Sequence, residues 1–299
     1  MKNFWQDIAF TLVFAVAMIV ALEVAIARTP NEYSYKDWYM TENADKIKIL
    51  ILGNSLFANS FDPHVFEDSV FDGAITGRRF FYDVEIVRKY APRMNNLEAV
   101  LIPLHICLFV EPQTELFYRY RNARFLGIPY GSNPLQYSAL FSDYLSYNHI
   151  FPQPIFKKME KNNRNSSGID SLGYSPLFNV WDGKSQHNES LKTFEEFMAS
   201  KEVFIGQLKK MAEICDSIGV RLICILPPLT NLYIGKIAPG QFDTLNYTMQ
   251  HLSNTLKIEY RFYHNDSAFR ADSLYFDELH LNYIGASLFA QRVKNDFNL

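Results

Sequence analysis

The feature that most constrains the fold is a short, strongly apolar segment that ends in Gly53-Asn54-Ser55. Five of the six residues from 47 to 52 are Ile or Leu. A run this short and this apolar predicts a strand buried on both faces, as in a parallel sheet. Open α/β folds bind ligands at the carboxyl edge of such a sheet, and Ser55 would lie at that edge. Ser55 is therefore a candidate nucleophile, although Asn54 and Ser55 could instead only cap a following helix.

A second segment, YFDELHLNYIGA, supplies the groups that a serine nucleophile needs. A serine hydroxyl is a weak nucleophile until a base removes its proton, and a third group must orient that base. Asp277 and His280 lie in this segment, 225 residues beyond Ser55 in the case of His280. Asn282 follows as the expected cap of a final helix over residues 283–297, whose apolar positions have helical spacing. The pattern predicts a catalytic triad of Ser55, His280 and Asp277.

In these two segments the chain resembles the SGNH (GDSL-like) hydrolase family. In that family the nucleophile follows the first strand, and a D-x-x-H motif precedes the last helix, as DELHLNYIGA does here. The resemblance implies acyl transfer through Ser55, with His280 as the base and Asp277 as its orienting partner. It also implies a flavodoxin-like sheet with strand order 2-1-3-4-5.

The alternation of apolar runs and amphipathic segments agrees with an α/β fold. Strand-like runs occupy 47–52, a run ending at 73–77, 99–104, 221–226 and about 260–263, and helical patterns occupy 79–90, 191–218, 241–256 and 283–297. This order predicts a three-layer α/β/α sandwich around a five-stranded parallel sheet. Residues 109–190 break the rhythm and are expected to form an insertion, either one that shapes the substrate pocket or a surface excursion without a role in recognition.

Three groups are candidates for the oxyanion hole. They are the backbone N–H of Ser55, Gly77 after the second strand, and His105 after the third strand. Gly77 matches a family glycine, but an ordinary turn glycine is the alternative. The family usually has an asparagine after the third strand, whereas this chain has Pro103-Leu104-His105, and His105 could equally be a structural residue.

The N-terminus carries a targeting signal. Residues 8–27 contain one charged residue, Glu23, and are long enough to cross a bilayer as a helix. We expect an anchor at 1–28, a polar tether at 29–45 and the catalytic domain at 46–299, outside the cytoplasm. A signal peptide cleaved near Ala25-Ile26-Ala27 is the alternative.

Composition limits the partners. A net charge of −3 without a basic stripe gives no reason to expect nucleic acid. Three cysteines, Cys107, Cys215 and Cys224, are expected to be buried apolar residues, and no spacing implies a metal or a cofactor.

With Asn54 where the family commonly has Asp before the serine, and Pro103-Leu104-His105 after the third strand, the chain resembles the membrane-anchored branch of the family. This resemblance implies a substrate: O-acetyl groups on extracytoplasmic glycans, hydrolysed or transferred. Six aromatic residues of the insertion are candidates for stacking on sugars: Tyr118, Tyr120, Tyr130, Tyr144, Tyr147 and Trp181. The alternative function is a non-catalytic glycan-binding or assembly module of the envelope.

Overall fold

The computed structural model describes residues 2–106, 116–138, 168–184, 191 and 193–299. The chain divides into two units. One unit comprises Tyr35–Pro112 and Gly168–Leu299, and the other comprises Met1–Ser34 and Gln113–Ser167. The first unit contains the sheet and all of the candidate catalytic residues.

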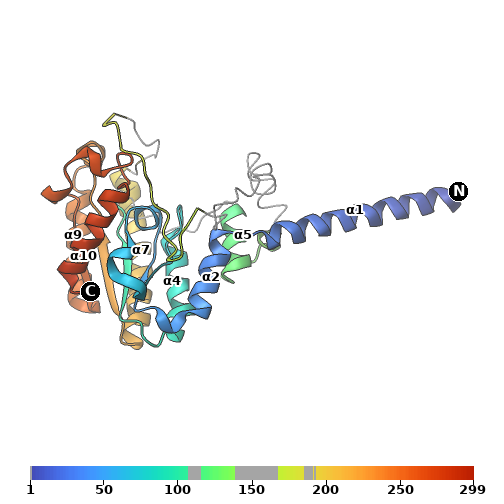
Figure 1. Cartoon of the computed structure of the whole chain (residues 1–299), viewed down its shortest axis with the longest axis horizontal. Helices are drawn as coiled ribbons and strands as arrows, with labels where there is room; N and C mark the ends of the chain where they lie inside the picture. The colour runs from blue at the N-terminus through green and yellow to red at the C-terminus, as the bar shows by residue number, and fades with distance from the viewer. Residues whose placement is uncertain (1, 107–115, 139–167, 185–190, 192) are drawn as a thin grey trace. The chain divides into compact units, whose positions relative to one another are not determined.

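The sheet has five parallel strands in the order β2-β1-β3-β4-β5, with helices on both faces (Figure 1). Its strands are β1 Ile49–Ile51, β2 Val70–Asp72, β3 Ala99–Pro103, β4 Arg221–Leu226 and β5 Ile258–Phe262. The predicted α/β class, the parallel sheet and the strand order are confirmed. Every strand runs in the same direction, so the loops that follow the strands gather at one edge.

The helices of this unit agree closely with the sequence pattern. They are α3 Ser55–Ala58, α4 Phe80–Tyr90, α7 Phe194–Ser217, α8 Asn231–Ile234, α9 Gln241–Leu256 and α10 Tyr283–Phe297. Short 3₁₀ helices lie at η1 Ala44–Lys46, η2 Pro63–Ser69, η3 Ala91–Arg93, η6 Ser267–Phe269 and η7 Asp272–Leu274. Helix α7 begins three residues later than expected. Thr193 and Glu196 form a capping box there, which satisfies the first free N–H groups of the helix.

The core lies on both sides of the sheet because successive strand residues point to opposite faces. On one face, Ile49 and Ile51 of β1 belong to an apolar cluster with Phe57, Phe61 and Phe289. The rings of Phe61 and Phe289 are 5.4 Å apart, which brings the segment after Ser55 against α10. Helices α4, α7 and α9 contact one another in sequence order, α4 with α7 and α7 with α9. Cys215 and Cys224 are buried as expected, and Cys107 lies outside the described residues.

The segment at 29–45, which the sequence predicts to be a polar tether, is largely helical in the structure. Helix α2 spans Glu32–Glu42, and Lys36 and Met40 on it are fully buried. The ring of Tyr39 stacks on that of Phe71 in β2 at 4.0 Å, and the ammonium of Lys36 donates to the carbonyl of Ala74. The apolar periodicity of the sequence did not predict this helix, because a lysine and tyrosines occupy its buried face in place of aliphatic residues.

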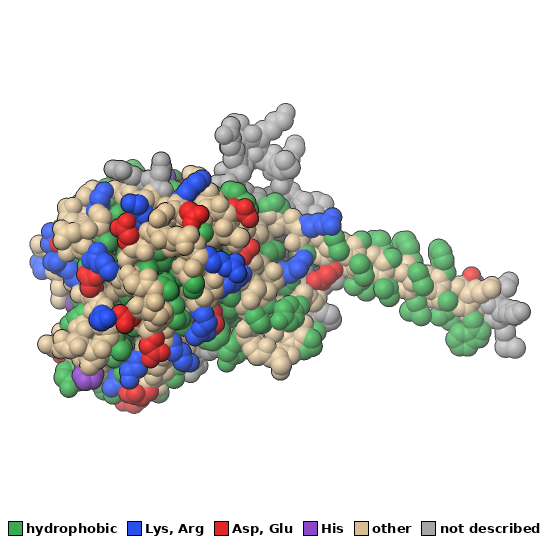
Figure 2. Space-filling view, turned by 90° about the horizontal axis from the view of Figure 1, so that it is seen from below, with side chains coloured by type: hydrophobic (Ala, Val, Ile, Leu, Met, Phe, Trp, Pro, Cys, Tyr) green, Lys and Arg blue, Asp and Glu red, His purple; other side chains and the backbone are tan. Residues whose placement is uncertain are grey.

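The other unit contains α1, Lys2–Arg28, together with α5, Leu116–Phe125, and η4, Pro134–Tyr137. Helix α1 contains an 18-residue segment with a mean hydropathy of 2.5, and it is long and apolar enough to cross a membrane. Figure 2 shows apolar side chains along its surface. Near its end, the carboxylate of Glu23 accepts a hydrogen bond from Ser138 at 3.1 Å. Length and composition therefore make α1 a candidate membrane anchor, and a signal sequence has the same features.

The region expected to be one insertion, 109–190, is divided between the two units. Residues 168–184 belong to the α/β unit, and residues 116–138 to the other. Tyr120 and Trp181 are 1% and 7% exposed, so these two rings pack inside their units and are not available for sugar stacking. Tyr144 and Tyr147 lie outside the described residues.

Truncating Met40 tests whether α2 is part of the folded domain. Met40→Ala should lower the free energy of unfolding by about 2–5 kcal/mol, because it leaves a cavity under a fully buried side chain. Urea denaturation provides the measurement, and Met198→Ala, on the partly exposed surface of α7, is the control. Equal stabilities of the two variants would mean that α2 is only loosely attached.

Candidate active site

The turn that presents Ser55 is fixed by three neighbouring segments. Gly53 has φ +116°, and a Cβ atom built on it would lie 2.3 Å from Cδ of Pro103, so only glycine fits here. Its N–H donates to Oδ1 of Asp83 at 3.2 Å, and its carbonyl accepts from the N–H of Ile75 at 2.9 Å. The nucleophile turn is thus held by the end of β3, by α4 and by the loop after β2.

Asn54 and Ser55 have different roles: Asn54 caps the helix, and Ser55 is the candidate nucleophile. Asn54 caps α3, since its side-chain oxygen accepts from the N–H of Leu56 at 3.0 Å. Ser55 is the first residue of that helix, and its hydroxyl lies 2.8 Å from Nε2 of His280. Capping by Asn54 therefore leaves the serine hydroxyl available for His280.

The three residues of the predicted triad lie together. Nδ1 of His280 is 3.0 Å from Oδ1 and 2.9 Å from Oδ2 of Asp277, on the opposite side of the ring from Ser55. This arrangement provides a nucleophile within reach of a base and a carboxylate that selects the tautomer of that base. Asp277 and His280 are three residues apart in one loop, whereas Ser55 reaches them from the other end of the chain.

Asp277 remains ionised at neutral pH despite its burial. Burial alone would raise the pKa of its carboxyl group, but the hydrogen bond and the charge of His280, with the backbone N–H groups of His280 and Leu279, lower the pKa to about 2. Those two N–H groups donate to Oδ1 at 2.7 and 2.8 Å. The loop therefore stabilises the charged form that can support a histidinium.

The loop that carries Asp277 and His280 is anchored on several sides. The N–H of Leu281 donates to Oγ of Ser60, just beyond α3, at 3.0 Å. Glu278 is buried and pairs with Nζ of Lys236 at 2.6 Å, and its carbonyl accepts from Oγ1 of Thr230 at 2.7 Å. These contacts connect the base to the segment after β4 and to the nucleophile.

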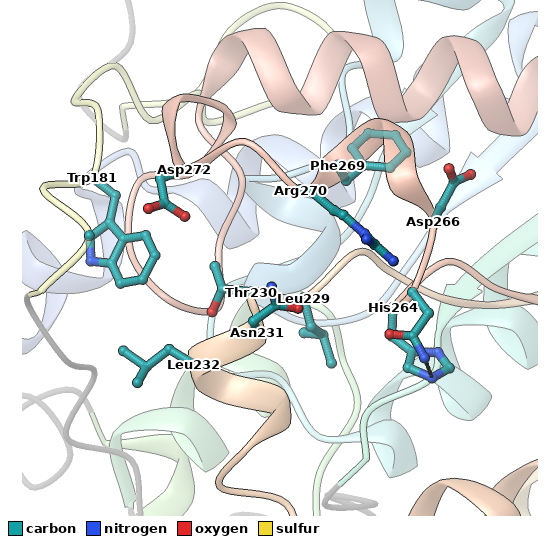
Figure 3. Close-up of a pocket in the computed structure, with 12 residues that line it drawn as sticks. Trp181, Leu229, Thr230, Asn231, Leu232, His264, Asp266, Phe269, Arg270 and Asp272 are labelled. Atoms are coloured by element: carbon teal, nitrogen blue, oxygen red, sulfur yellow. Dashed lines mark hydrogen bonds between the residues drawn. The ribbon is translucent and has the colours of Figure 1, made fainter.

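A cavity of about 260 Å³ lies behind this loop, between the segments that follow β4 and β5. Figure 3 shows Thr230 and Asn231 between Trp181 and Asp272 on one side and Arg270 on the other. None of the three triad residues is among its lining residues. The cavity therefore does not contain the triad. It includes Thr230, whose hydroxyl donates to the carbonyl of Glu278 in the catalytic loop.

A buried charge pair beneath the nucleophile turn was missed by the sequence analysis. Nη1 of Arg78 lies 3.5 Å from Oδ1 of Asp83, the oxygen that accepts from Gly53, and 2.6 Å from the carbonyl of Gly73. Nε and Nη2 of Arg78 have no hydrogen-bond partner among the described residues. Burial raises the pKa of Asp83 to about 6, and Arg78 opposes this only in part. The sequence signal for this burial was the position of Asp83 next to Val84 and Val87, which form the apolar face of the helix.

Two of the predicted oxyanion groups, Gly77 and His105, lie in the segments after β2 and β3, the two strands that flank β1. Gly77 has φ +76° and lies in a turn closed by the hydrogen bond from the N–H of Arg78 to the carbonyl of Ile75. His105 follows β3 and is 8% exposed. Their roles, and that of the Ser55 N–H, remain predictions. In the described part of the chain, no group of three or more His, Cys, Asp or Glu residues could hold a metal ion.

Replacing Asp83 tests the cost of its burial. The carboxyl binds its proton more tightly in the folded chain, with a pKa of about 6, than in the unfolded chain, with a pKa of 3.8. Its contribution to stability is therefore greatest below pH 3.8 and is lost as the pH rises through 6. Asp83→Asn removes this dependence, so the stability of the variant relative to wild type should improve by about 2–3 kcal/mol from pH 4 to pH 7.

Chemical denaturation at several pH values gives the measurement for Asp83→Asn. Glu85→Gln, on the same helix but partly exposed, should keep the pH dependence of wild type. A difference between Asp83→Asn and wild type that stays constant from pH 4 to pH 7 would contradict the expected burial cost.

Comparison with known proteins adds one structural likeness. No protein-family model matches the chain, and no curated protein matches it. Among 16 matching chains of solved structures is a protein from Streptococcus pneumonia, described provisionally as a platelet activating factor. It is 10% identical, with a TM-score of 0.46 over 97% of this chain and 99% of that one.

Proposed function

We propose that the protein is a serine-dependent O-acyl ester hydrolase or O-acyltransferase of the SGNH type. The observation that carries the proposal is the alignment of Ser55, His280 and Asp277. Oγ of Ser55 lies 2.8 Å from one ring nitrogen of His280, and the carboxylate of Asp277 lies 2.9 Å from the other. This is the geometry in which a histidine can remove the proton of a serine while a carboxylate stabilises its charge.

The reaction follows from these positions. His280 accepts the proton of Ser55 as the hydroxyl oxygen attacks the carbonyl carbon of an ester, and a tetrahedral oxyanion forms. His280 then gives the proton to the leaving alcohol, and the acyl group stays on Ser55. Water or an acceptor hydroxyl, deprotonated by His280, attacks the acyl-enzyme and releases Ser55 in its original form. Hydrolysis and transfer differ only in this last nucleophile.

The oxyanion requires hydrogen-bond donors, and each typically lowers the barrier by about 2.7–4 kcal/mol. We assign this role to the N–H of Ser55 and to Gly77, with His105 as a third candidate. Gly53, in the turn before Ser55, and Ile75, two residues before Gly77, are joined by a hydrogen bond of 2.9 Å, which supports the pairing of the two segments.

The proposed substrate is an acetyl ester of an extracytoplasmic glycan. Two features support it: the departure from the common family pattern at Pro103-Leu104-His105, in which the chain resembles the membrane-anchored branch, and helix α1, which is long and apolar enough to span a bilayer. An anchored enzyme with its catalytic unit outside the cytoplasm would meet polysaccharide that has been exported. The buried rings of Tyr120 and Trp181 do not contribute sugar contacts to this proposal.

A non-catalytic envelope module is the second candidate. It is favoured by Pro103-Leu104-His105, which stands where the family usually has its asparagine donor. Under this alternative the three residues would keep their contacts but give no turnover.

Labelling with a fluorophosphonate distinguishes the two candidates. Wild type should react, because only a serine activated by a base is phosphonylated, and Ser55→Ala should not react while keeping its melting temperature. Asp277→Asn should react much more slowly, since a wrongly oriented histidine costs on the order of 10⁴-fold in rate. Ser253→Ala, on α9, is the matched control and should label as wild type does. An unlabelled, correctly folded wild type would favour the non-catalytic module.

Release of acetate tests the substrate class. The full chain should release acetate from an acetylated oligosaccharide more efficiently than from a simple aryl acetate, because contacts to the sugar contribute to transition-state binding. Both activities should disappear in Ser55→Ala. Equal efficiency on the two esters would leave the serine mechanism in place but reject the glycan as the recognised group.

A further inference from the structure

A short turn in the same unit as α1 presents apolar side chains to solvent. We call residues 130–138, which include η4, the η4 turn. Leu135 and Tyr137 on it are 40% and 52% exposed, whereas Gln136 between them is 1% exposed. This is the reverse of the usual order, in which leucine is buried and glutamine faces water. The η4 turn therefore directs its apolar side chains outward and its amide inward.

The outward position of these side chains is fixed by hydrogen bonds within the turn. The N–H of Tyr130 donates to Oε1 of Gln136 at 3.0 Å, and Nε2 of Gln136 donates to the carbonyl of Gly131 at 3.1 Å. The side-chain oxygen of Asn133 accepts from the N–H of Leu135 at 3.0 Å, which caps η4. Leu135 and its neighbour are thus exposed because the buried amide holds the backbone, and not because the segment lacks structure.

The η4 turn lies beside the last turns of α1 and not beyond its end. Oγ of Ser138 donates to the carboxylate of Glu23 at 3.1 Å. Glu23 precedes Arg28, the last residue of α1, by five residues, which is about 7.5 Å along a helix. Leu135 and Tyr137 are therefore within three residues of a direct contact to the apolar helix.

The length of α1 places the edge of a bilayer at this level. The candidate span, Phe4–Arg28, has 25 residues, and its apolar segment is not buried in the described part of the chain. A helix of this length is about 37 Å long. The hydrocarbon core of a bilayer is about 30 Å thick, and the headgroup layers bring the bilayer to about 40–45 Å. In a bilayer that α1 crosses, the residues near Glu23 and Arg28 therefore lie where hydrocarbon gives way to headgroups.

Positive charge and aromatic rings gather in the same unit. The guanidinium of Arg121 on α5 lies over the ring of Tyr33, just after α1, 5.8 Å from its centroid. That of Arg119 lies over the ring of Tyr130 in the η4 turn at 4.9 Å. These contacts connect α5 both to the end of α1 and to the turn, and Arg124 on α5 is exposed. Arginine binds phosphate groups well, and tyrosine is enriched at the level of the headgroups.

We propose that the η4 turn inserts Leu135 and Tyr137 into the headgroup boundary of the same bilayer that α1 crosses. The occupant of this surface is lipid, because the turn is held against a helix whose exposed apolar surface itself needs lipid, at the level where the headgroups begin. The unit then has two contacts with the membrane, a span and an inserted turn. The inference depends on α1 as a retained span and is independent of the serine mechanism.

Tryptophan fluorescence tests the inserted turn, with the full chain held in phosphatidylcholine nanodiscs. Tyr137→Trp should add emission to that of the three native tryptophans, and a nitroxide placed on the lipid near its headgroup should quench more than half of it. Tyr247→Trp, at a 74% exposed tyrosine of α9, is the matched control, and its added emission should be quenched little. Adding Leu135→Asp to Tyr137→Trp should reduce the quenching severalfold, since a charge disfavours entry into the apolar boundary. All three positions are exposed, so the fold should be retained.

The proposal fails if the emission added by Tyr137→Trp is quenched no more than that added by Tyr247→Trp, which is the result expected when water or a protein partner covers the turn. It also fails if Leu135→Asp leaves the quenching unchanged, or if the chain loses α1 and leaves the nanodisc. Fluorophosphonate labelling of Ser55 does not depend on any of these results. Failure of the inserted turn and failure of the serine mechanism therefore remain distinguishable.

Discussion

The close approach of Gly53 to the end of β3 is the constraint on which the rest of the site depends. The backbone at Gly53 passes so near to Pro103 that any side chain would collide with it, and a positive φ turns the chain out of the sheet at that point. The turn places Ser55 at the carboxyl end of β1, where the loops after the other strands also lie. Without this turn, Ser55 could not meet a histidine from the far end of the chain.

Two charged side chains are buried beneath the nucleophile turn, and one of them holds its backbone by a hydrogen bond. Arg78 and Asp83 are buried beneath it, and Asp83 accepts the N–H of Gly53. Burial makes the charged form of Asp83 unfavourable, as its raised pKa indicates. A carboxylate there is costly to the fold, but it fixes a backbone N–H that would otherwise be unpaired in the interior. Such a trade is expected where geometry at a site matters more than stability.

The catalytic loop shows the opposite electrostatic arrangement. Asp277 is also partly buried, but hydrogen bonds from its own loop and from His280 lower its pKa to about 2. The pKa values of the two carboxyl groups therefore shift in opposite directions. Asp277 accepts several hydrogen bonds that favour its charged form, whereas burial is the largest effect on Asp83. Two exposed apolar residues of α10, Tyr283 and Ile284, follow the base His280 by three and four residues.

By itself the sequence determined the α/β class, most element boundaries and the identity of Ser55, Asp277 and His280. These follow from local patterns: strand runs, helical spacing and a loop that carries an acid and a histidine three residues apart. Only the tertiary structure decided that α2 is packed, that Asp83 holds the nucleophile turn and that Phe178 contacts Tyr283 of α10. Each of these depends on contacts between residues distant in sequence, and no local pattern encodes which polar side chain is buried. The physical reason is that burial and pairing are properties of the assembled chain, whereas periodicity is a property of a segment.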